Sequence, residues 1–155
     1  MTDVIYKMSK FLANSHLMGD VHTTKVRSYN MSQIKGKNTK PEILVRQYLF
    51  GKGLRYRIHG KLPGRPDIVF SKNRVAIFVH GCFWHGHTGC KYFVVPKTRT
   101  EWWLNKINGN CANDRKNLCT LQEEGWKVVV VWECELRKGR LEDTLARLYS
   151  YLQTC

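Results

Sequence analysis

Residues 65–80 read RPDIVFSKNRVAIFVH, two short apolar runs joined by a polar turn. Arg65 to Phe70 is typical of a strand, Lys72-Asn73 of the turn that follows, and Val75 to Val79 of a second strand. The second run is almost purely apolar, which indicates that both of its faces are buried. Because a strand covered on both faces needs other elements above and below it, this hairpin predicts the centre of a layered sheet.

Helices and further strands are predicted on both sides of this hairpin. Thr39, Pro41 and Glu42 have the spacing of a capping box with proline in the first turn. Thr98 and Glu101 are spaced as a second capping box. The expected elements are a helix over 39–51, a half-exposed strand over 54–58, a helix over 98–124, a buried strand over 128–131 and a helix over 141–152. This order predicts an α/β fold, a single domain with a central mixed β-sheet flanked by helices.

The chain has 155 residues, the size of one domain. We place that domain at 27–155. Residues 1–26 are polar and without clear periodicity, and are interpreted as a loosely ordered N-terminal arm.

The composition favours a polyanionic partner. The chain carries 26 Lys and Arg against 12 Asp and Glu, a formal net charge of +14. Such an excess is typical of proteins that bind nucleic acid. No apolar run has the length of a membrane span or of a secretory signal, so a cytoplasmic location and no membrane partner are expected. Disulfides are rare in that compartment, so the six cysteines are predicted to be metal ligands and free thiols.

Cysteines and histidines crowd residues 82–90, CFWHGHTGC. Zinc prefers thiolate and imidazole ligands in a tetrahedron, and Cys82, His87 and Cys90 can supply three of them. Cys134, just beyond the buried strand at 128–131, is the expected fourth ligand. An alternative set replaces His87 by His85. Four protein ligands leave no position for water, so the zinc is predicted to be structural.

Asp67 is the only acidic residue between Glu42 and Glu101. A carboxylate on an apolar strand is costly to bury unless it meets a cation. Mg²⁺ held there can neutralise a phosphate and activate water. The competing interpretation is an ion pair with Arg65 or Arg74.

The next strand carries only part of a known nuclease pattern. Many restriction-type nucleases follow Pro-Asp with an acid and a lysine on that strand, and here these positions hold Phe78 and His80. His80 and His85 can instead transfer protons near neutral pH. Glu42 and Asp114 are the remaining acids that can orient a water or a histidine.

Several segments together resemble one family, the very short patch repair endonucleases. They are LPGRPD at 62–67, HGCFWH at 80–85, the Pro-x-Thr-Arg-Thr-Glu-x-Trp pattern at 96–103, Gly125-Trp126 and VWEC at 131–134. The resemblance covers about residues 27–135, and its motifs fall in the family's order. It implies a restriction-endonuclease-like fold and Mg²⁺-dependent nicking of duplex DNA on the 5′ side of the thymine in a T:G mismatch, the lesion left by deamination of 5-methylcytosine. A monomer is expected, and mismatch-repair proteins remain open as partners.

The resemblance also assigns roles to single residues. It implies that Mg²⁺ is bound by Asp67 and by the main-chain carbonyl of Val79. The implied catalytic residues are His80, His85 with its supporting acid Asp114, and Glu42 on the first helix. The implied structural zinc ligands are Cys82, His87, Cys90 and Cys134. The implied DNA contacts are the intercalating Phe83, Trp84 and Trp103, Met31 from the opposite groove, and the base-contacting Lys106 and Asn110.

The pair Phe83-Trp84 on a metal-held loop is expected to be exposed and to insert between base steps. Unstacking costs least at a mismatch, so such a wedge favours damaged sites. Trp102 is predicted to pack on the core instead. Cys111, Cys119 and Cys155 are interpreted as buried thiols.

Two other functions are compatible with these residues. One is a restriction- or junction-type nuclease of the same fold that ignores T:G pairs. The other is a zinc-stapled DNA-binding module without catalysis. Asp67, His80 and His85 argue against the binding module, because a pure binder needs no acid facing a phosphate.

Overall fold

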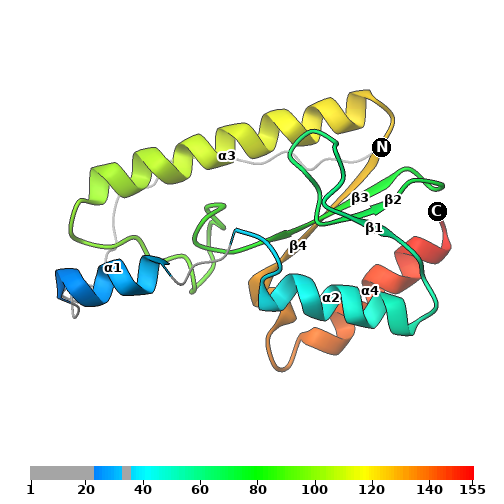
Figure 1. Cartoon of the computed structure of the whole chain (residues 1–155), viewed down its shortest axis with the longest axis horizontal. Helices are drawn as coiled ribbons and strands as arrows, with labels where there is room; N and C mark the ends of the chain where they lie inside the picture. Colours follow the sequence, from blue (N-terminus) through cyan, green and yellow to red (C-terminus); the bar gives the residue numbers. More distant parts are fainter. Residues whose placement is uncertain (1–22, 33–35) are drawn as a thin grey trace.

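The computed structural model describes residues 23–32 and 36–155 of the chain (Figure 1). The predicted arm, 1–26, therefore lies almost entirely outside the described residues, and helix α1 runs across its end. Within the described part, helices and strands follow in the order α1 (Thr24–Ser32), α2 (Lys40–Gly51), β1 (Arg57–Ile58), β2 (Ile68–Phe70), β3 (Val75–His80), α3 (Thr100–Glu123), β4 (Lys127–Trp132), the 3₁₀ helix η1 (Glu133–Leu136) and α4 (Leu141–Gln153). None of the helices in these ranges is long and apolar enough to cross a membrane.

The four strands form one mixed sheet in the order β1-β2-β3-β4. β1, β2 and β3 pair antiparallel, whereas β3 and β4 run parallel with His80 opposite Trp132. The parallel pair is connected through the 24-residue helix α3. The predicted mixed sheet with flanking helices is confirmed, and the carboxyl ends of β3 and β4 lie side by side.

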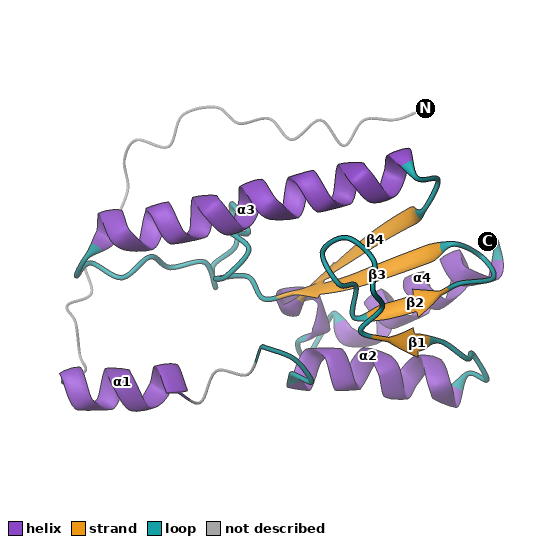
Figure 2. Ribbon diagram, turned by 45° about the horizontal axis from the view of Figure 1, so that its top comes forward, coloured by secondary structure: helices purple, strands orange, loops and turns teal. Residues whose placement is uncertain are grey.

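Every residue of β3 is buried, and its side chains alternate between two cores. Val75, Ile77 and Val79 pack with apolar side chains of α2 and α4, while Ala76 and Phe78 pack with those of α3. Figure 2 shows the resulting layers, with α3 on one side of the sheet and α2 and α4 on the other. The prediction of a strand buried on both faces is confirmed.

Backbone conformation shortens two of the predicted strands. β2 begins at Ile68 rather than Arg65, because Arg65 has a left-handed φ of 52° and Pro66 has no N–H to donate to a ladder. β1 contains only Arg57 and Ile58 of the predicted 54–58.

Of the two helix starts predicted from capping boxes, one has a side-chain cap and the other has none. Thr39 caps α2, where its hydroxyl accepts from the Glu42 N–H and donates to Glu42 Oε1 at 2.8 Å. The box predicted from Thr98 and Glu101 is wrong, because α3 begins at Thr100 after the left-handed Arg99, and no side chain caps it.

Candidate active site and metal centre

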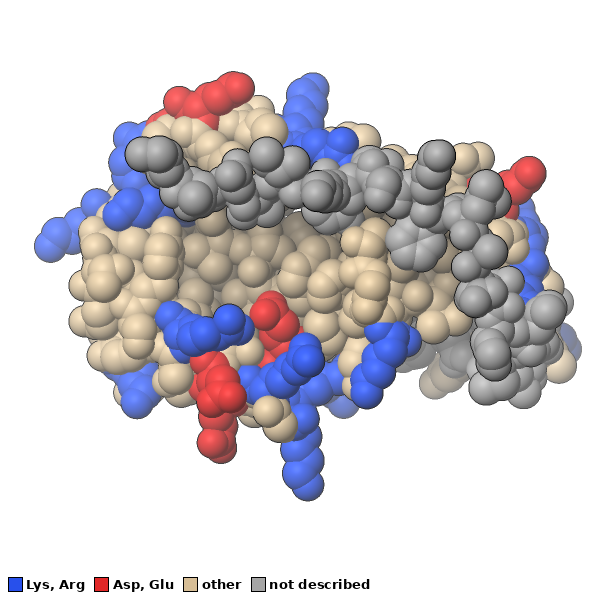
Figure 3. All heavy atoms as spheres, turned by 180° about the vertical axis from the view of Figure 1, so that it is seen from behind, with Lys and Arg blue, Asp and Glu red and all other residues tan. Residues whose placement is uncertain are grey.

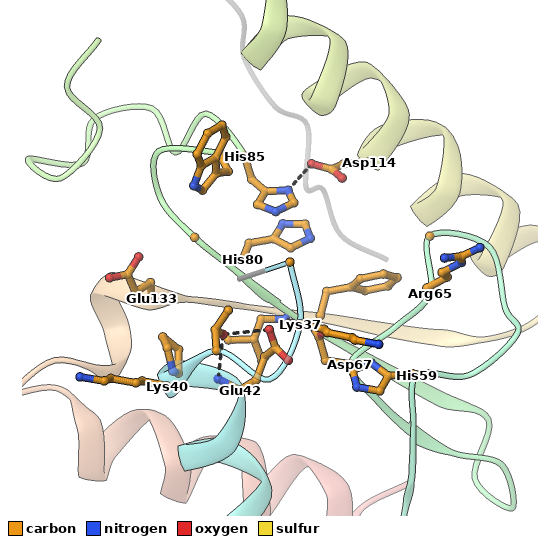
Figure 4. Close-up of a pocket in the computed structure, with 18 of the residues that line it drawn as sticks. Lys37, Lys40, Glu42, His59, Arg65, Asp67, His80, His85, Asp114 and Glu133 are labelled. Carbon is orange, nitrogen blue, oxygen red and sulfur yellow. Dashed lines mark hydrogen bonds and ion pairs between the residues drawn. The ribbon is translucent and has the colours of Figure 1, made fainter. Parts of the chain in front are cut away.

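One open cavity of about 1240 Å³ lies at the carboxyl end of β3 (Figure 4). It is lined by residues from the loop before α2, from α2, from the turn before β2, from the loop after β3 and from α3. All five residues predicted to be catalytic line it: Glu42, Asp67, His80, His85 and Asp114. Glu42 and Asp114, which are 72 positions apart in the sequence, are thus brought to one pocket.

Asp67 sits just before β2, next to the end of β3. Its Oδ2 accepts a hydrogen bond from the Val79 N–H at 2.7 Å, and its own N–H donates to the Ile77 carbonyl. Burial raises the pKa of Asp67, and the charge of Glu42 adds to the rise, although the Val79 N–H opposes it. In the described part of the chain no Lys or Arg forms an ion pair with the Asp67 carboxylate, and a desolvated carboxylate without such a partner fits a divalent metal ion. Among the described residues no ion pair joins Asp67 to Arg65 or Arg74, and Arg74 instead lies over the Trp126 ring.

Glu42 is 4% exposed, and its carboxylate is held by the protein. Oε2 accepts from the Asn38 N–H at 2.8 Å and from an Arg46 Nη at 3.0 Å. Arg46 in turn donates to Asn38 Oδ1 at 2.7 Å and to the Asp67 carbonyl at 3.4 Å. This buried network ties the start of α2 to the strand that carries Asp67.

His80, His85 and Asp114 form a compact group on the other side of the pocket. The two imidazole rings stack, with centroids 3.8 Å apart and planes 6° apart. Nδ1 of His85 lies 2.6 Å from Asp114 Oδ2 (dashed in Figure 4). A carboxylate at Nδ1 favours the tautomer with hydrogen there, which leaves Nε2 of His85 as a proton acceptor. Burial lowers the pKa of His80 to about 4, with a further lowering from His85 and opposition from Asp114, so this imidazole is neutral at pH 7.

Cys82, His87, Cys90 and Cys134 form a second cluster behind the pocket. One ligand atom from each lies within 4.8 Å of all the others, which is the spacing of a tetrahedral metal site. The His87 ring also stacks on Trp132, with centroids 4.0 Å apart. The alternative ligand set is not supported, because His85 is engaged by Asp114 and lies outside this cluster. Burial raises the pKa of Cys82 to about 12 and raises that of Cys134; a bound cation would hold both as thiolates.

The aromatic side chains beside the pocket pack on one another. The Phe83 ring lies 5.1 Å from Trp84 and 5.4 Å from Trp103, both edge to face. All three are half-buried, so the prediction that the pair Phe83-Trp84 is exposed is wrong. Trp102 is 48% exposed and contacts Trp103 and Arg99 rather than the core, which contradicts its predicted packing.

The predicted base-contacting residues lie on α3, close to this aromatic cluster in sequence. Lys106 is exposed, and Asn110 Nδ2 donates to the Trp84 carbonyl at 2.9 Å. Asn110 therefore braces the aromatic loop. Met31 lies on α1, with its side chain outside the described residues.

Several pocket residues were missed by the sequence analysis. Lys37, His59 and Arg65 line the cavity, and Asn38 and Arg46 support it. The residues with left-handed φ values of 50–55° are Asn38, His59 and Arg65. Asparagine is known to tolerate this region, but a single sequence does not otherwise predict where such a conformation occurs.

The other cysteines differ in their exposure. Cys119 is exposed, and Cys111 and Cys155 are only partly buried, so the interpretation as buried thiols is wrong. Cys111 Sγ donates to the His85 carbonyl at 3.4 Å.

Basic side chains are spread over the surface. Figure 3 shows Lys and Arg side chains along several edges of one face, with Asp and Glu interspersed among them. On this face the basic side chains are therefore not gathered into one patch, and the net charge of +14 attracts a polyanion from a distance.

Comparison with known proteins points in the same direction as the geometry. The family model described as DNA mismatch endonuclease Vsr matches residues 19–91. The chain is 50% identical to the type II nicking enzyme V.NmeAIP of Neisseria meningitidis over 133 residues, 84% of this chain and 94% of the relative. It is 48% identical to the type II nicking enzyme V.XorIIP of Xanthomonas oryzae, with 84% and 97% covered. It is 50% identical to the DNA mismatch endonuclease Vsr of Escherichia coli over 121 residues, with 77% of each chain covered.

Proposed function

Because the chain belongs to the Vsr family of DNA mismatch endonucleases, and is therefore a DNA endonuclease, we propose that it nicks duplex DNA on the 5′ side of the thymine in a T:G mismatch. The observation that carries the proposal is the convergence of Asp67, His80, His85 and Asp114 on one pocket. An acid fit for a cation and a carboxylate-oriented imidazole are the two components that phosphodiester hydrolysis requires. We also assign the sheet and its helices to the restriction-endonuclease-like fold.

Asp67 and the Val79 main-chain carbonyl would hold Mg²⁺. The N–H and C=O groups of a residue in an extended strand point to the same side, so the Val79 carbonyl is directed to the side from which its N–H contacts Asp67. Two oxygens from adjacent strands suit a hard cation that keeps several water ligands. When bound, the ion supplies charge neutralisation at the phosphate.

His85 acts as the general base in this proposal. Asp114 orients its ring, and Nε2 takes a proton from the attacking water as the water oxygen bonds to phosphorus. One P–O ester bond breaks in the same step, and the sugar oxygen that leaves takes a proton from solvent water. His80, neutral and stacked on His85, fixes the position of that ring. This arrangement gives each residue of the group a distinct role.

The cluster of Cys82, His87, Cys90 and Cys134 suits structural zinc. Three thiolates and one imidazole complete a tetrahedron without water. His85 lies between two of these ligands in the sequence, so the metal would hold the general base in place. It would equally hold Phe83 and Trp84, the proposed wedge.

The DNA-binding part of the proposal concerns the aromatic cluster and α3. Phe83, Trp84 and Trp103 would insert at the mismatch, with Met31 entering from the opposite groove, and Lys106 and Asn110 would contact bases. We further propose that the protein acts as a monomer.

A nicking assay tests the proposal. Two labelled duplexes identical except for one T:G pair are incubated with protein and Mg²⁺. A single nick beside the mismatched thymine, absent from the T:A control, is the expected result. Equal cutting of both duplexes would favour a restriction- or junction-type nuclease, and nicking that persists in EDTA would remove Mg²⁺ from the scheme.

A further inference from the structure

The strand that ends in the pocket offers no permanent positive charge to a phosphate. Phe78, in the acid position of the restriction-type pattern, packs in the core with Leu121. His80, in the lysine position, is 6% exposed and lies against Phe78, His85 and Trp132. A side-chain cation that acts beside Mg²⁺ on the negative charge developing on a phosphate in the transition state has to come from another element.

The acidic groups that line the pocket, apart from Asp67, are already paired. Glu42 is joined to Arg46 at 3.0 Å, Asp114 to His85 at 2.6 Å and Glu133 to Arg137 at 2.8 Å. The remaining cations of the lining make no ion pair with any residue that the structure describes: Lys37, Lys40, Lys61 and Arg65. One of these four is the best source of the missing charge.

Lys37 is distinguished from the others by the anchoring of its backbone. Its neighbour Asn38 has a left-handed φ of 55°, and the Asn38 N–H donates to Glu42 Oε2 at 2.8 Å. Asn38 Oδ1 accepts from Arg46 at 2.7 Å and lies 3.3 Å from His59 Nε2. The buried pair of Glu42 and Arg46 thus holds a left-handed residue next to Lys37, and uncommon backbone conformations held in this way are found at functional sites.

The direction of the side chains supports the same choice. In Figure 4 Lys37 extends along the side of the pocket that holds Asp67 and His59, below the stacked histidines in this view. Lys40, three residues later, points outward in the opposite direction, and Arg65 extends toward α3. Lys37 is thus the unpaired cation placed beside the metal-binding carboxylate.

We propose that Lys37 is a catalytic residue that donates a hydrogen bond from Nζ to a non-bridging oxygen of the scissile phosphate, and that Glu42 and Asn38 are its positioning residues. The inference rests on the proposed function, because it needs a phosphodiester in this pocket. Lys37 supplies the positive charge that β3, with His80 in the lysine position, does not supply. Glu42 then also serves catalysis through the segment that it holds.

Single-turnover nicking of the T:G duplex, at saturating protein and Mg²⁺, tests the assignment. We expect Lys37→Met to lower the rate about 100-fold, the usual effect of removing one transition-state donor. Affinity for the duplex should change less than about threefold. Lys40→Met is the matched control and should change the rate by less than about threefold, while Lys37→Arg should retain at least about a tenth of it. If the nicking rate of Lys37→Met lies within threefold of the rate of Lys40→Met, the assignment is overturned. It is also overturned if Lys37→Met nicks slowly only at low protein concentration, because the substitution then affects binding and not the chemical step.

A double-mutant cycle tests the positioning residues. Asn38→Ala should slow nicking about tenfold in the wild-type background and have almost no effect in the Lys37→Met background. Equal losses in both backgrounds would contradict a role through Lys37. If the wild-type protein cuts matched duplex instead, the proposed T:G specificity is wrong. The role of Lys37 can still be tested, because the same variants are then compared on the duplex that the protein cuts.

Discussion

Replacing Asp114 by asparagine should damage catalysis more than replacing it by alanine. Asp114 Oδ2 lies 2.6 Å from His85 Nδ1, and the two side chains are 25% and 28% exposed. A hydrogen bond with a charged partner contributes about 1.5–3 kcal/mol, and partial exposure places this one toward the lower end. Since about 1.4 kcal/mol is a tenfold change in rate, Asp114→Ala should slow nicking roughly 10- to 30-fold.

Asparagine adds a second fault to the loss of charge. Its amide can donate to Nδ1 of His85, which moves the ring hydrogen to Nε2 and removes the proton acceptor. We therefore expect Asp114→Asn to be at least about tenfold slower than Asp114→Ala.

The assay is single-turnover nicking of the T:G duplex at saturating protein, so that binding does not enter the rate. Asp143→Asn, on the exposed first turn of α4, is the charge-matched control and should nick at the wild-type rate. An Asp114→Asn variant as fast as Asp114→Ala would refute the tautomer argument and leave Asp114 a purely structural partner.

Three further outcomes are expected. Trp84→Ala should reduce the preference for mismatched over matched duplex about tenfold or more while general affinity falls less, and equal losses on both duplexes in a binding titration would contradict the wedge. Cys134→Ala should release the zinc and lower the melting temperature by about 10 °C, the equivalent of about 4 kcal/mol for a domain of this size; elemental analysis and calorimetry check this, and an unchanged zinc content would remove Cys134 from the ligand set. The Mg²⁺ concentration for half-maximal nicking should rise as pH falls, because burial raises the pKa of Asp67 and a proton then competes with the cation at a higher pH than at an exposed Asp; a requirement that stays constant down to about pH 5 would argue against Asp67 as the ligand.

Short sequence patterns were enough to predict those elements whose structure depends on neighbouring residues alone. The apolar run at Val75–Val79 identified the central strand, because a continuous apolar strand has to be covered on both faces. Thr39 and Glu42 marked the start of α2 correctly, since a capping box is complete within four residues. The capping-box prediction failed at α3, because the left-handed Arg99 precedes the helix and α3 therefore begins at Thr100.

The residues of the candidate site can be divided in the same way into those that short sequence patterns predict and those that depend on distant contacts. Asp67 was found because an isolated acid on an apolar strand is unusual, and the loop around His85 was found because metal ligands cluster in it. The network of Asn38, Glu42 and Arg46 escaped notice, since it depends on a left-handed backbone and on the distance between a helix and a strand. Nothing in the spacing of residues along a chain reports such a distance.

The order of the strands has a consequence for biosynthesis. β1, β2 and β3 form a local antiparallel meander, so they can pair as soon as they leave the ribosome. β4 can join only after all of α3 has been made, and Cys134 follows β4. Asp67 and His80 are therefore in place early, whereas the partner of His85 and the last ligand of the cysteine cluster come from the final third of the chain. A nascent or truncated polypeptide is harmless to the chromosome on this account, because the ability to cut DNA is acquired only when translation is nearly finished.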